Sequence, residues 1–277
     1  LYLTVEKEKW KMARFKLFIE YEGTRYSGWQ VQKNSRTIQG ELIGAAKNVF
    51  NTNEFELYGS GRTDAGVHAL CQVAHLDVKT VLDPKIIRMK LNDQLPADIN
   101  ILEVQKVNPN FHAHYSAVTR SYIYQISRRR TAFGKRYVWW IKDQLDAQTM
   151  HHAAQNFIGM KNFESFTADD PDEKSMQGII DVVELREVGD LILLRIAGSH
   201  FLWKMVRQMV GVIAEVGRGK LSLNEVKNFL HSPSDIPAKL TAPPSGLFLE
   251  RVYYRPVRKF PELKPVMEIP SFHQYEE

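Results

Sequence analysis

The chain has 277 residues, of which 44% are hydrophobic and 25% are charged, and this composition predicts either one large folded domain or two smaller ones. A single cysteine, Cys71, excludes an intramolecular disulfide and a cysteine-rich zinc site and indicates a reducing cytoplasm. No apolar run is long enough to span a bilayer, so we expect no membrane partner, and the formal net charge of +5 is compatible with a polyanionic one.

Hydrophobic periodicity divides the first half of the chain into six predicted elements in the order β-α-β-β-α-β. Alternation of Phe15, Leu17, Ile19 and Tyr21 predicts the first strand, and Ser35 or Thr37 is placed to cap the helix that follows. The predicted elements are a strand over 14–22, a helix over 38–49, strands over 55–58 and 67–78, a helix that begins at Asp83-Pro84 and a strand over 99–107.

The second half repeats this order. We predict a strand over 118–127, a helix capped by Asp146, a hairpin of strands over 178–187 and 191–197, a long helix over 200–216, a short helix capped by Ser222 and a last strand over 247–254. Two such units predict an α+β fold, in which duplicated ferredoxin-like β-α-β-β-α-β units form an extended, mostly antiparallel sheet with a central cleft.

This organisation predicts two α/β domains, over 12–116 and 117–256, and the glycine-rich loop over 59–69 lies in the first of them. Residues 1–11 are treated as an extension of unknown role, and residues 257–277 as a tail.

The segment from Gly59 to Ala69 carries an Arg-x-Asp pair, Arg62 and Asp64, in a loop with three glycines in eight residues. Glycines let a backbone take positive φ angles and approach a ligand closely. An arginine can keep a partly buried carboxylate ionised, and such a carboxylate is a potential nucleophile. For an arbitrary sequence, a turn with a surface salt bridge is the more frequent outcome.

A basic segment follows the predicted strand over 118–127. Seven basic residues and no acid lie between Arg120 and Lys142, interleaved with tyrosine, phenylalanine and tryptophan. Cations for phosphates and rings for base stacking are typical of a nucleic-acid surface, although a solvated loop beside core aromatics is the common alternative. The predicted RNA contacts in this segment are Arg128, Arg129, Arg130, Lys135 and Arg136.

The predicted helix over 200–216 has an apolar stripe and an opposite face of His200, Lys204, Arg207 and Gly211. This face either points to water or lines the cleft, where Arg207 would be a second cation for Asp64 and Lys204 a further RNA contact. Sequence alone leaves the two readings about even.

The histidines lack the spacing of a metal site, so neither a metal nor a catalytic histidine is predicted. The glycine-rich loop also lacks the Gly-Lys-Ser/Thr of a nucleotide-hydrolysing loop.

Residues 61–69, Gly-Arg-Thr-Asp-Ala-Gly-Val-His-Ala, resemble the active-site motif of the tRNA pseudouridine synthase A family. The resemblance runs from about Phe15 to Tyr254. It includes the stretches Tyr21–Gln30, Phe111–Ala113 before Ser116-Ala117, Arg120–Tyr124, Phe201–Arg207 and Ala242–Leu249.

The resemblance implies an isomerase without cofactor that converts uridine to pseudouridine in tRNA, at nucleotides 38 to 40 of the anticodon stem-loop, and a homodimer that grips the tRNA. It implies Asp64 as the nucleophile and Arg62 and Arg207 as cations around it. It also implies Tyr122 as the ring that stacks on the target uracil and a candidate for proton transfer at C5. Leu247 would be the apolar residue against the base, with Leu249 as the alternative.

The chain departs from the resemblance at one place. Family members often carry a basic Ser/Arg-rich stretch before the strand that begins here near Gly178, whereas this chain has the acidic residues 169–173. We expect an acidic loop to weaken any phosphate contact there.

Two other functions are weighed against the isomerase. A non-catalytic RNA-binding protein on the same fold would be favoured by loss of Asp64 or Tyr122, and both are present. An interaction scaffold with an incidental basic face would bind tRNA negligibly and without salt dependence.

Overall fold

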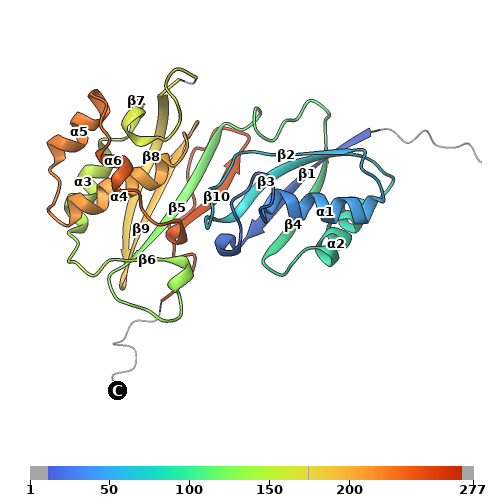
Figure 1. The fold of residues 1–277 in the computed structure, drawn as a ribbon, viewed down its shortest axis with the longest axis horizontal. Helices are drawn as coiled ribbons and strands as arrows, with labels where there is room; N and C mark the ends of the chain where they lie inside the picture. Colours follow the sequence, from blue (N-terminus) through green and yellow to red (C-terminus); the bar gives the residue numbers. More distant parts are fainter. Residues whose placement is uncertain (1–11, 174, 270–277) are drawn as a thin grey trace, which may run out of the picture.

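A computed structural model describes residues 12–173 and 175–269 of the chain (Figure 1). Within these residues, ten strands form one sheet in the order β4-β1-β3-β10-β5-β9-β8-β7, with β2 paired to β3 and β6 paired to β5. The predicted extension over 1–11 and the last part of the predicted tail lie outside the described residues.

The first half contains β1 (Met12–Tyr21), α1 (Ile38–Phe50), β2 (Phe55–Gly59), β3 (His68–Lys79), α2 (Pro84–Gln94) and β4 (Ile99–Val107). Its strands lie in the order β4-β1-β3-β2, which confirms the predicted ferredoxin-like unit. The alternating apolar residues of β1 are buried. Thr37, not Ser35, caps α1 by accepting the N–H of Gly40, and Asp83 caps α2.

The second half contains β5 (Thr119–Ser127), α3 (Ala147–Gln155), β8 (Gln177–Val188), β9 (Leu191–Gly198), α4 (Met205–Gly217) and β10 (Leu247–Tyr253). Their strands lie in the order β10-β5-β9-β8, the same arrangement as in the first half. The duplication predicted from periodicity is therefore confirmed. The additional elements are β6 (Trp139–Trp140), β7 (Gly159–Asn162), α5 (Leu223–His231), α6 (Ile236–Lys239) and four short 3-10 turns, η1 (Gly23–Arg25), η2 (Lys135–Tyr137), η3 (Glu164–Phe166) and η4 (Pro244–Gly246).

The two units join where β10 pairs with β3, in parallel, through Phe248 opposite His68 and Leu249 opposite Ala69. Parallel strands begin at the same edge of a sheet. The residues just before β3, which include Asp64, and the first residue of β10, Leu247, therefore meet at one edge of the junction between the two halves (Figure 1).

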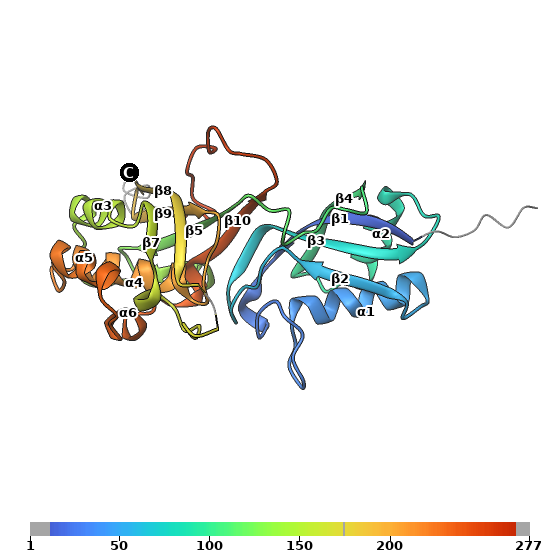
Figure 2. The same cartoon turned by 90° about the horizontal axis from the view of Figure 1, so that it is seen from above.

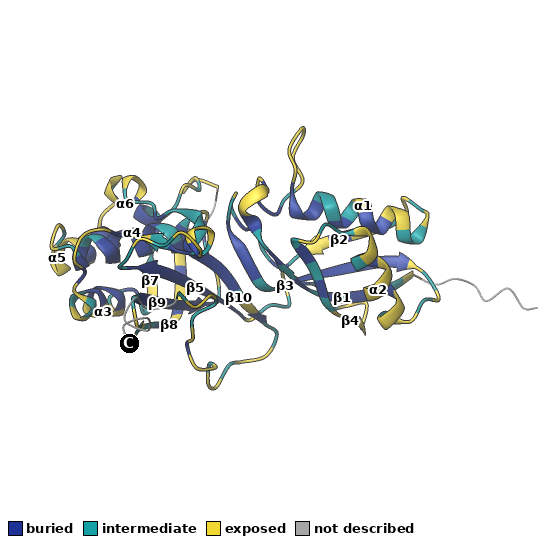
Figure 3. Ribbon diagram, turned by 90° about the horizontal axis from the view of Figure 1, so that it is seen from below, coloured by how far each residue is buried: buried dark blue, intermediate teal, exposed yellow. Residues whose placement is uncertain are grey.

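The described part of the tail crosses the second half of the sheet. Side chains alternate along a strand, so the face of β5 and β9 that carries Ile123 and Leu193 is opposite the face that packs on the helices. Leu263 and its neighbours cover this second face, and the segment loops away from α4 and α6 (Figure 2). Both faces of β5 and β9 are consequently buried along their whole length (Figure 3).

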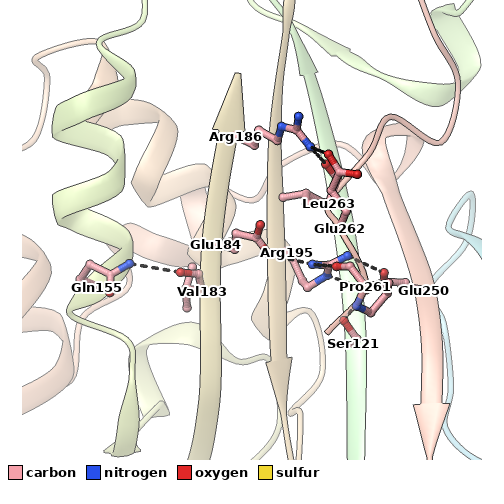
Figure 4. Close-up of polar contacts among 10 residues, drawn as sticks. All are labelled: Ser121, Gln155, Val183, Glu184, Arg186, Arg195, Glu250, Pro261, Glu262 and Leu263. Carbon is pink, nitrogen blue, oxygen red and sulfur yellow. Dashed lines mark hydrogen bonds and ion pairs between the residues drawn. The ribbon is translucent and has the colours of Figure 1, made fainter. Parts of the chain in front are cut away.

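Buried polar contacts hold this segment in place (Figure 4). Arg195 of β9, 1% exposed, donates to both carboxylate oxygens of Glu250 at 2.9 and 2.8 Å, to Glu184 and to the carbonyl of Pro261. The hydroxyl of Ser121 donates to the same Glu250 carboxylate. The sequence offered no signal for this network.

The long helix predicted over 200–216 begins later, at Met205. Lys204 has a φ of 63°, in the left-handed region, and this conformation ends any continuous helix at that residue. The main chain of Trp203 is instead hydrogen-bonded to residues 167–169. Tertiary contacts thus override the helical periodicity of residues 200–204. Separately, no helix in the described ranges is both long and apolar enough to cross a bilayer.

Candidate active site

A small cavity of about 50 Å³ lies at the junction of the two halves. It is lined by all five residues for which the sequence predicts a role at the reaction centre, and also by Lys204. They come from the loop before β3 (Arg62 and Asp64), from β5 (Tyr122), from the N-cap and first turn of α4 (Lys204 and Arg207) and from the start of β10 (Leu247).

The loop that carries Asp64 is fixed by hydrogen bonds on both sides. Thr63 accepts the N–H of Trp29 on its carbonyl, and its side-chain oxygen is 2.8 Å from the hydroxyl of Tyr21. Gly28 permits the close packing. It has a φ of 91°, and a Cβ there would lie 2.5 Å from the carbonyl oxygen of Thr63. The loop is therefore held in one conformation, not left as an open turn.

Arg120 ties this loop to the second half of the chain. Its guanidinium is buried and donates to the carbonyls of Ser60, His114 and Ser199. The sequence placed Arg120 among the cations of a nucleic-acid surface, and that interpretation is wrong for this residue. It is a structural cation whose charge lies on main-chain oxygens.

The Asp64 carboxylate has a partner on each oxygen. Arg207 Nη1 donates to Oδ2 at 2.8 Å, and the indole Nε1 of Trp203 donates to Oδ1 at 3.1 Å. The side chains of Asp64 and Arg207 are 20% and 14% exposed, so the pair is accessible from the cavity and only partly desolvated. Arg207 Nε also donates to the carbonyl of Ala242, which fixes the guanidinium.

The predicted polar face over 200–211 does not exist as a helical face. His200 and Lys204 precede α4, and Gly211 packs against the main chain of Leu240, where a Cβ would lie 1.7 Å from the carbonyl oxygen. Arg207 nevertheless reaches Asp64, because it lies in the first turn of the helix.

Arg62 lies differently from what the sequence suggested. It is exposed and lines the same cavity, but in the described part of the chain the salt bridge of Asp64 is with Arg207. The cation nearest in sequence is thus not the cation that pairs with the carboxylate.

Tyr122 and Leu247 form the apolar side of the cavity. The Tyr122 ring packs edge-to-face against Phe201 with 4.9 Å between ring centroids. Burial raises the pKa of Tyr122 to about 12, and the neighbouring Asp64 adds to the increase while Arg120 opposes it. Leu247 lines the cavity and Leu249 does not, which favours the first of the two leucines named from the sequence.

The basic segment after β5 is only partly available to a ligand. Arg128 is paired with Glu187 and Arg129 with Asp190, whereas Arg130, Lys135 and Arg136 are exposed. Of the aromatic residues, Tyr122 and Tyr124 belong to the core, and Phe133 and Trp140 are exposed. A second cavity of about 700 Å³ is lined by residues of this segment, among them Arg130, Lys135, Trp139 and Trp140.

Sequence reasoning missed two partners of the site. Trp203 lies in a stretch that carries the family resemblance, but its side chain gave no hint of a bond to Asp64. Asp169, counted only as part of an acidic loop, accepts the main-chain N–H of Trp203 at 2.8 Å. Neither contact follows from periodicity, because both depend on the interruption of the helix at Lys204. No group of three or more His, Cys, Asp or Glu residues arranged to hold a metal ion occurs within residues 12–173 and 175–269.

Known proteins resemble this chain in sequence over most of its length. The tRNA pseudouridine synthase family model matches residues 17–116 and 153–255. A protein named tRNA pseudouridine synthase A from Rhodopseudomonas palustris is 40% identical over 246 residues, which cover 88% of this chain and 100% of the relative. Its namesake from Halalkalibacterium halodurans is 38% identical over 242 residues, with 87% and 92% coverage. Among solved structures, a Cbf5-Nop10-Gar1 complex matches 72% of this chain and 54% of its own, at a TM-score of 0.32 and 11% identity.

Proposed function

The chain belongs to the tRNA pseudouridine synthase family, and from this premise we propose that it isomerises uridine to pseudouridine in tRNA with Asp64 as the nucleophile. The observation that carries the residue assignment is the Asp64 carboxylate itself. It faces a cavity together with Tyr122 and Leu247 and is paired with Arg207. An ionised carboxylate beside an apolar wall suits covalent chemistry on an uncharged ring.

The reaction is balanced within the nucleotide. The N1–C1′ bond of uridine breaks, the C5–C1′ bond forms, C5 loses a proton and N1 gains one. Asp64 acts by attack on C1′, by attack on C6 or through a glycal route. A base in a stem must first be flipped out, which costs a few kcal/mol of unstacking. The Tyr122 ring and Leu247 offset this cost by packing on the extruded base, and the cavity has to widen to admit it.

The raised pKa of Tyr122 sharpens its part in this proposal. A phenol with a pKa of about 12 is protonated at neutral pH, so it cannot accept the C5 proton unless it first gives up its own. Its proposed role is therefore ring stacking, with the hydroxyl as a donor or a relay.

The RNA contacts are proposed with a ranking that the geometry supports. Arg130, Lys135 and Arg136 are exposed, and Lys204 lines the cavity with Asp64, so these four are the first candidates for phosphates. Arg128 and Arg129 would have to exchange Glu187 and Asp190 for phosphate. The family resemblance supports the finer parts of the proposal: nucleotides 38 to 40 as targets, a homodimer that holds one tRNA, and action in the cytoplasm.

The test is to incubate the protein with unmodified tRNA transcripts and to map pseudouridine by carbodiimide-primer extension. We expect Asp64→Ala and Asp64→Asn to abolish turnover and to keep tRNA binding, since one carboxylate contributes little to a phosphate-dominated interface. Asp93→Asn is the matched control, because it makes the same charge change at an exposed site of α2.

Three outcomes separate the candidate functions. Turnover by Asp64→Asn at the parent rate would contradict the nucleophile assignment. Salt-dependent tRNA binding without turnover in the parent protein would indicate the non-catalytic RNA-binding alternative. Negligible binding without salt dependence would indicate a scaffold.

A further inference from the structure

We propose that Trp203 is a positioning residue for the Asp64 carboxylate, and that Asp169 acts through Trp203 by fixing its main chain. The inference rests on the proposed role of Asp64. It gives a role in the reaction to Asp169, the first residue of the acidic stretch 169–173. From the sequence, this stretch was expected only to weaken phosphate contacts.

The hydrogen bonds form a continuous path from the loop to the carboxylate. Asp169 Oδ2 accepts the N–H of Trp203 at 2.8 Å, and the carbonyl of Trp203 accepts both the Thr167 hydroxyl and the N–H of Ala168, each at 3.2 Å. The indole Nε1 of Trp203 then donates to Asp64 Oδ1 at 3.1 Å. Both main-chain polar groups of Trp203 are thus engaged, and its side chain is aimed at the carboxylate.

The turn itself is also engaged. The N–H of Asp169 donates to the Thr167 hydroxyl oxygen at 2.9 Å. The next residue after Trp203, Lys204, is a non-glycine residue at a φ of 63°, a conformation that is strained for a residue with a Cβ. Such backbone strain persists where surrounding contacts impose it, and the bonds of residues 167–169 to Trp203 are contacts of this kind.

The indole N–H of Trp203 is a neutral donor, so it holds the Asp64 carboxylate without adding a second positive charge beside it. Trp203 is 52% exposed, so the indole contributes little as a core residue. Its bond, together with that of Arg207, fixes the carboxylate rotamer. Each carboxylate oxygen keeps a further lone pair for the substrate.

The decisive variant is Trp203→Phe, which keeps an aromatic ring and removes the donor. We expect the single-turnover rate on an unmodified tRNA transcript at saturating enzyme to fall about tenfold, as expected for loss of a hydrogen bond to a charged group. The KM for tRNA should stay unchanged.

The second variant tests the role of Asp169. Asp169→Ala should lower the single-turnover rate, as Trp203→Phe does, and the double variant should lower it no further than Trp203→Phe alone, because the two residues act on one path. Asp170→Ala is the matched control. It removes the same charge from the same loop, but Asp170 is exposed and bonds to the N–H of Asp172, not to Trp203. Asp170→Ala should leave the rate unchanged.

A measurement without turnover keeps the inference falsifiable if these variants fold poorly. The chain has five tryptophans, so five indole N–H signals are expected in its NMR spectrum. The signal that is lost in Trp203→Phe should also be the one that shifts most in Asp64→Asn, because its N–H donates to the Asp64 carboxylate. If the Trp203 signal does not respond to Asp64→Asn, or if Trp203→Phe leaves the single-turnover rate unchanged, the inference is wrong. Activity in Asp64→Asn would instead overturn the proposed function, so the two failures are distinguishable.

Discussion

Two arginine–carboxylate pairs of this protein differ in their surroundings. Arg195 and Glu250 lie between the second half of the sheet and the segment over 255–269, with side chains 1% and 11% exposed (Figure 4). Arg207 and Asp64 lie at the junction of the two halves, with side chains 14% and 20% exposed. The two ion-pair distances are equal, at 2.8 Å.

The difference lies in what the pairs leave open. Arg195 uses its donors on Glu250, Glu184 and the Pro261 carbonyl, and Glu250 also accepts from Ser121, so charge and hydrogen-bonding capacity are used within the protein. Asp64 faces a cavity. A closed pair joins segments of the fold, whereas an open pair retains acceptor capacity for a ligand, and the ion-pair distance alone does not tell them apart.

The largest expected effect comes from breaking the closed pair. Arg195→Met leaves the Glu250 carboxylate buried without its cation, which should reduce the free energy of unfolding by about 3–5 kcal/mol. Urea denaturation followed by circular dichroism measures this loss. The turnover rate per folded molecule should stay near that of the parent, since Arg195 does not line the cavity.

The matched control removes both charges. Arg195→Met combined with Glu250→Gln should recover part of the lost stability, because the remaining amide can be hydrogen-bonded without a counter-charge. A stability loss below about 1 kcal/mol in Arg195→Met would contradict the description of this pair as structural.

The corresponding change in the open pair should act on rate more than on stability. We expect Arg207→Gln to lower kcat by about 10²–10³-fold, since it removes a fixed charge from the reaction centre. The free energy of unfolding should fall by only about 1–2 kcal/mol, through the lost bond to Ala242. Arg207→Lys keeps the charge, but an ammonium group cannot reproduce the simultaneous bonds of the guanidinium to Asp64 and to the carbonyl of Ala242. The kcat should therefore recover only in part. Equal stability losses in Arg207→Gln and Arg195→Met would remove the distinction between the pairs.

The fold was predictable because its causes are local. Alternation in β1 and the caps at Thr37, Asp83 and Asp146 fix most elements within a few residues, and two matching element orders predict the duplication. The helix over 200–216 was predicted to begin five residues early for the opposite reason. Residues 200–204 have helical periodicity, but their conformation is set by contacts with residues 167–169, which are distant in sequence.

The sequence predicted which residues line the site better than it predicted which of them bond to one another. The loop motif and the family resemblance named Asp64, Tyr122, Arg207 and Leu247, and all four line one cavity. The partner of the carboxylate depends on which side chains the junction brings within bonding distance. That geometry places Arg207 and Trp203 on Asp64 and buries Arg120 under the loop.

The smallest expected effect, at Arg62, separates proximity in sequence from pairing in space. Arg62 is exposed at the cavity, and Arg207 makes the salt bridge to Asp64. We therefore expect Arg62→Ala to act on RNA binding: the KM for tRNA should rise a few-fold, and the slope of log affinity against log salt should become shallower by about 0.7–0.9, the share of one phosphate contact. Filter binding at four salt concentrations measures the slope. Lys90→Ala, an exposed cation of α2, is the control and should leave it unchanged. Unlike Trp203→Phe, Arg62→Ala should leave the single-turnover rate at saturating enzyme unchanged, because the salt bridge between Arg207 and Asp64 is retained. A slower single turnover in Arg62→Ala would show that Arg62 also acts on the Asp64 carboxylate when tRNA is bound.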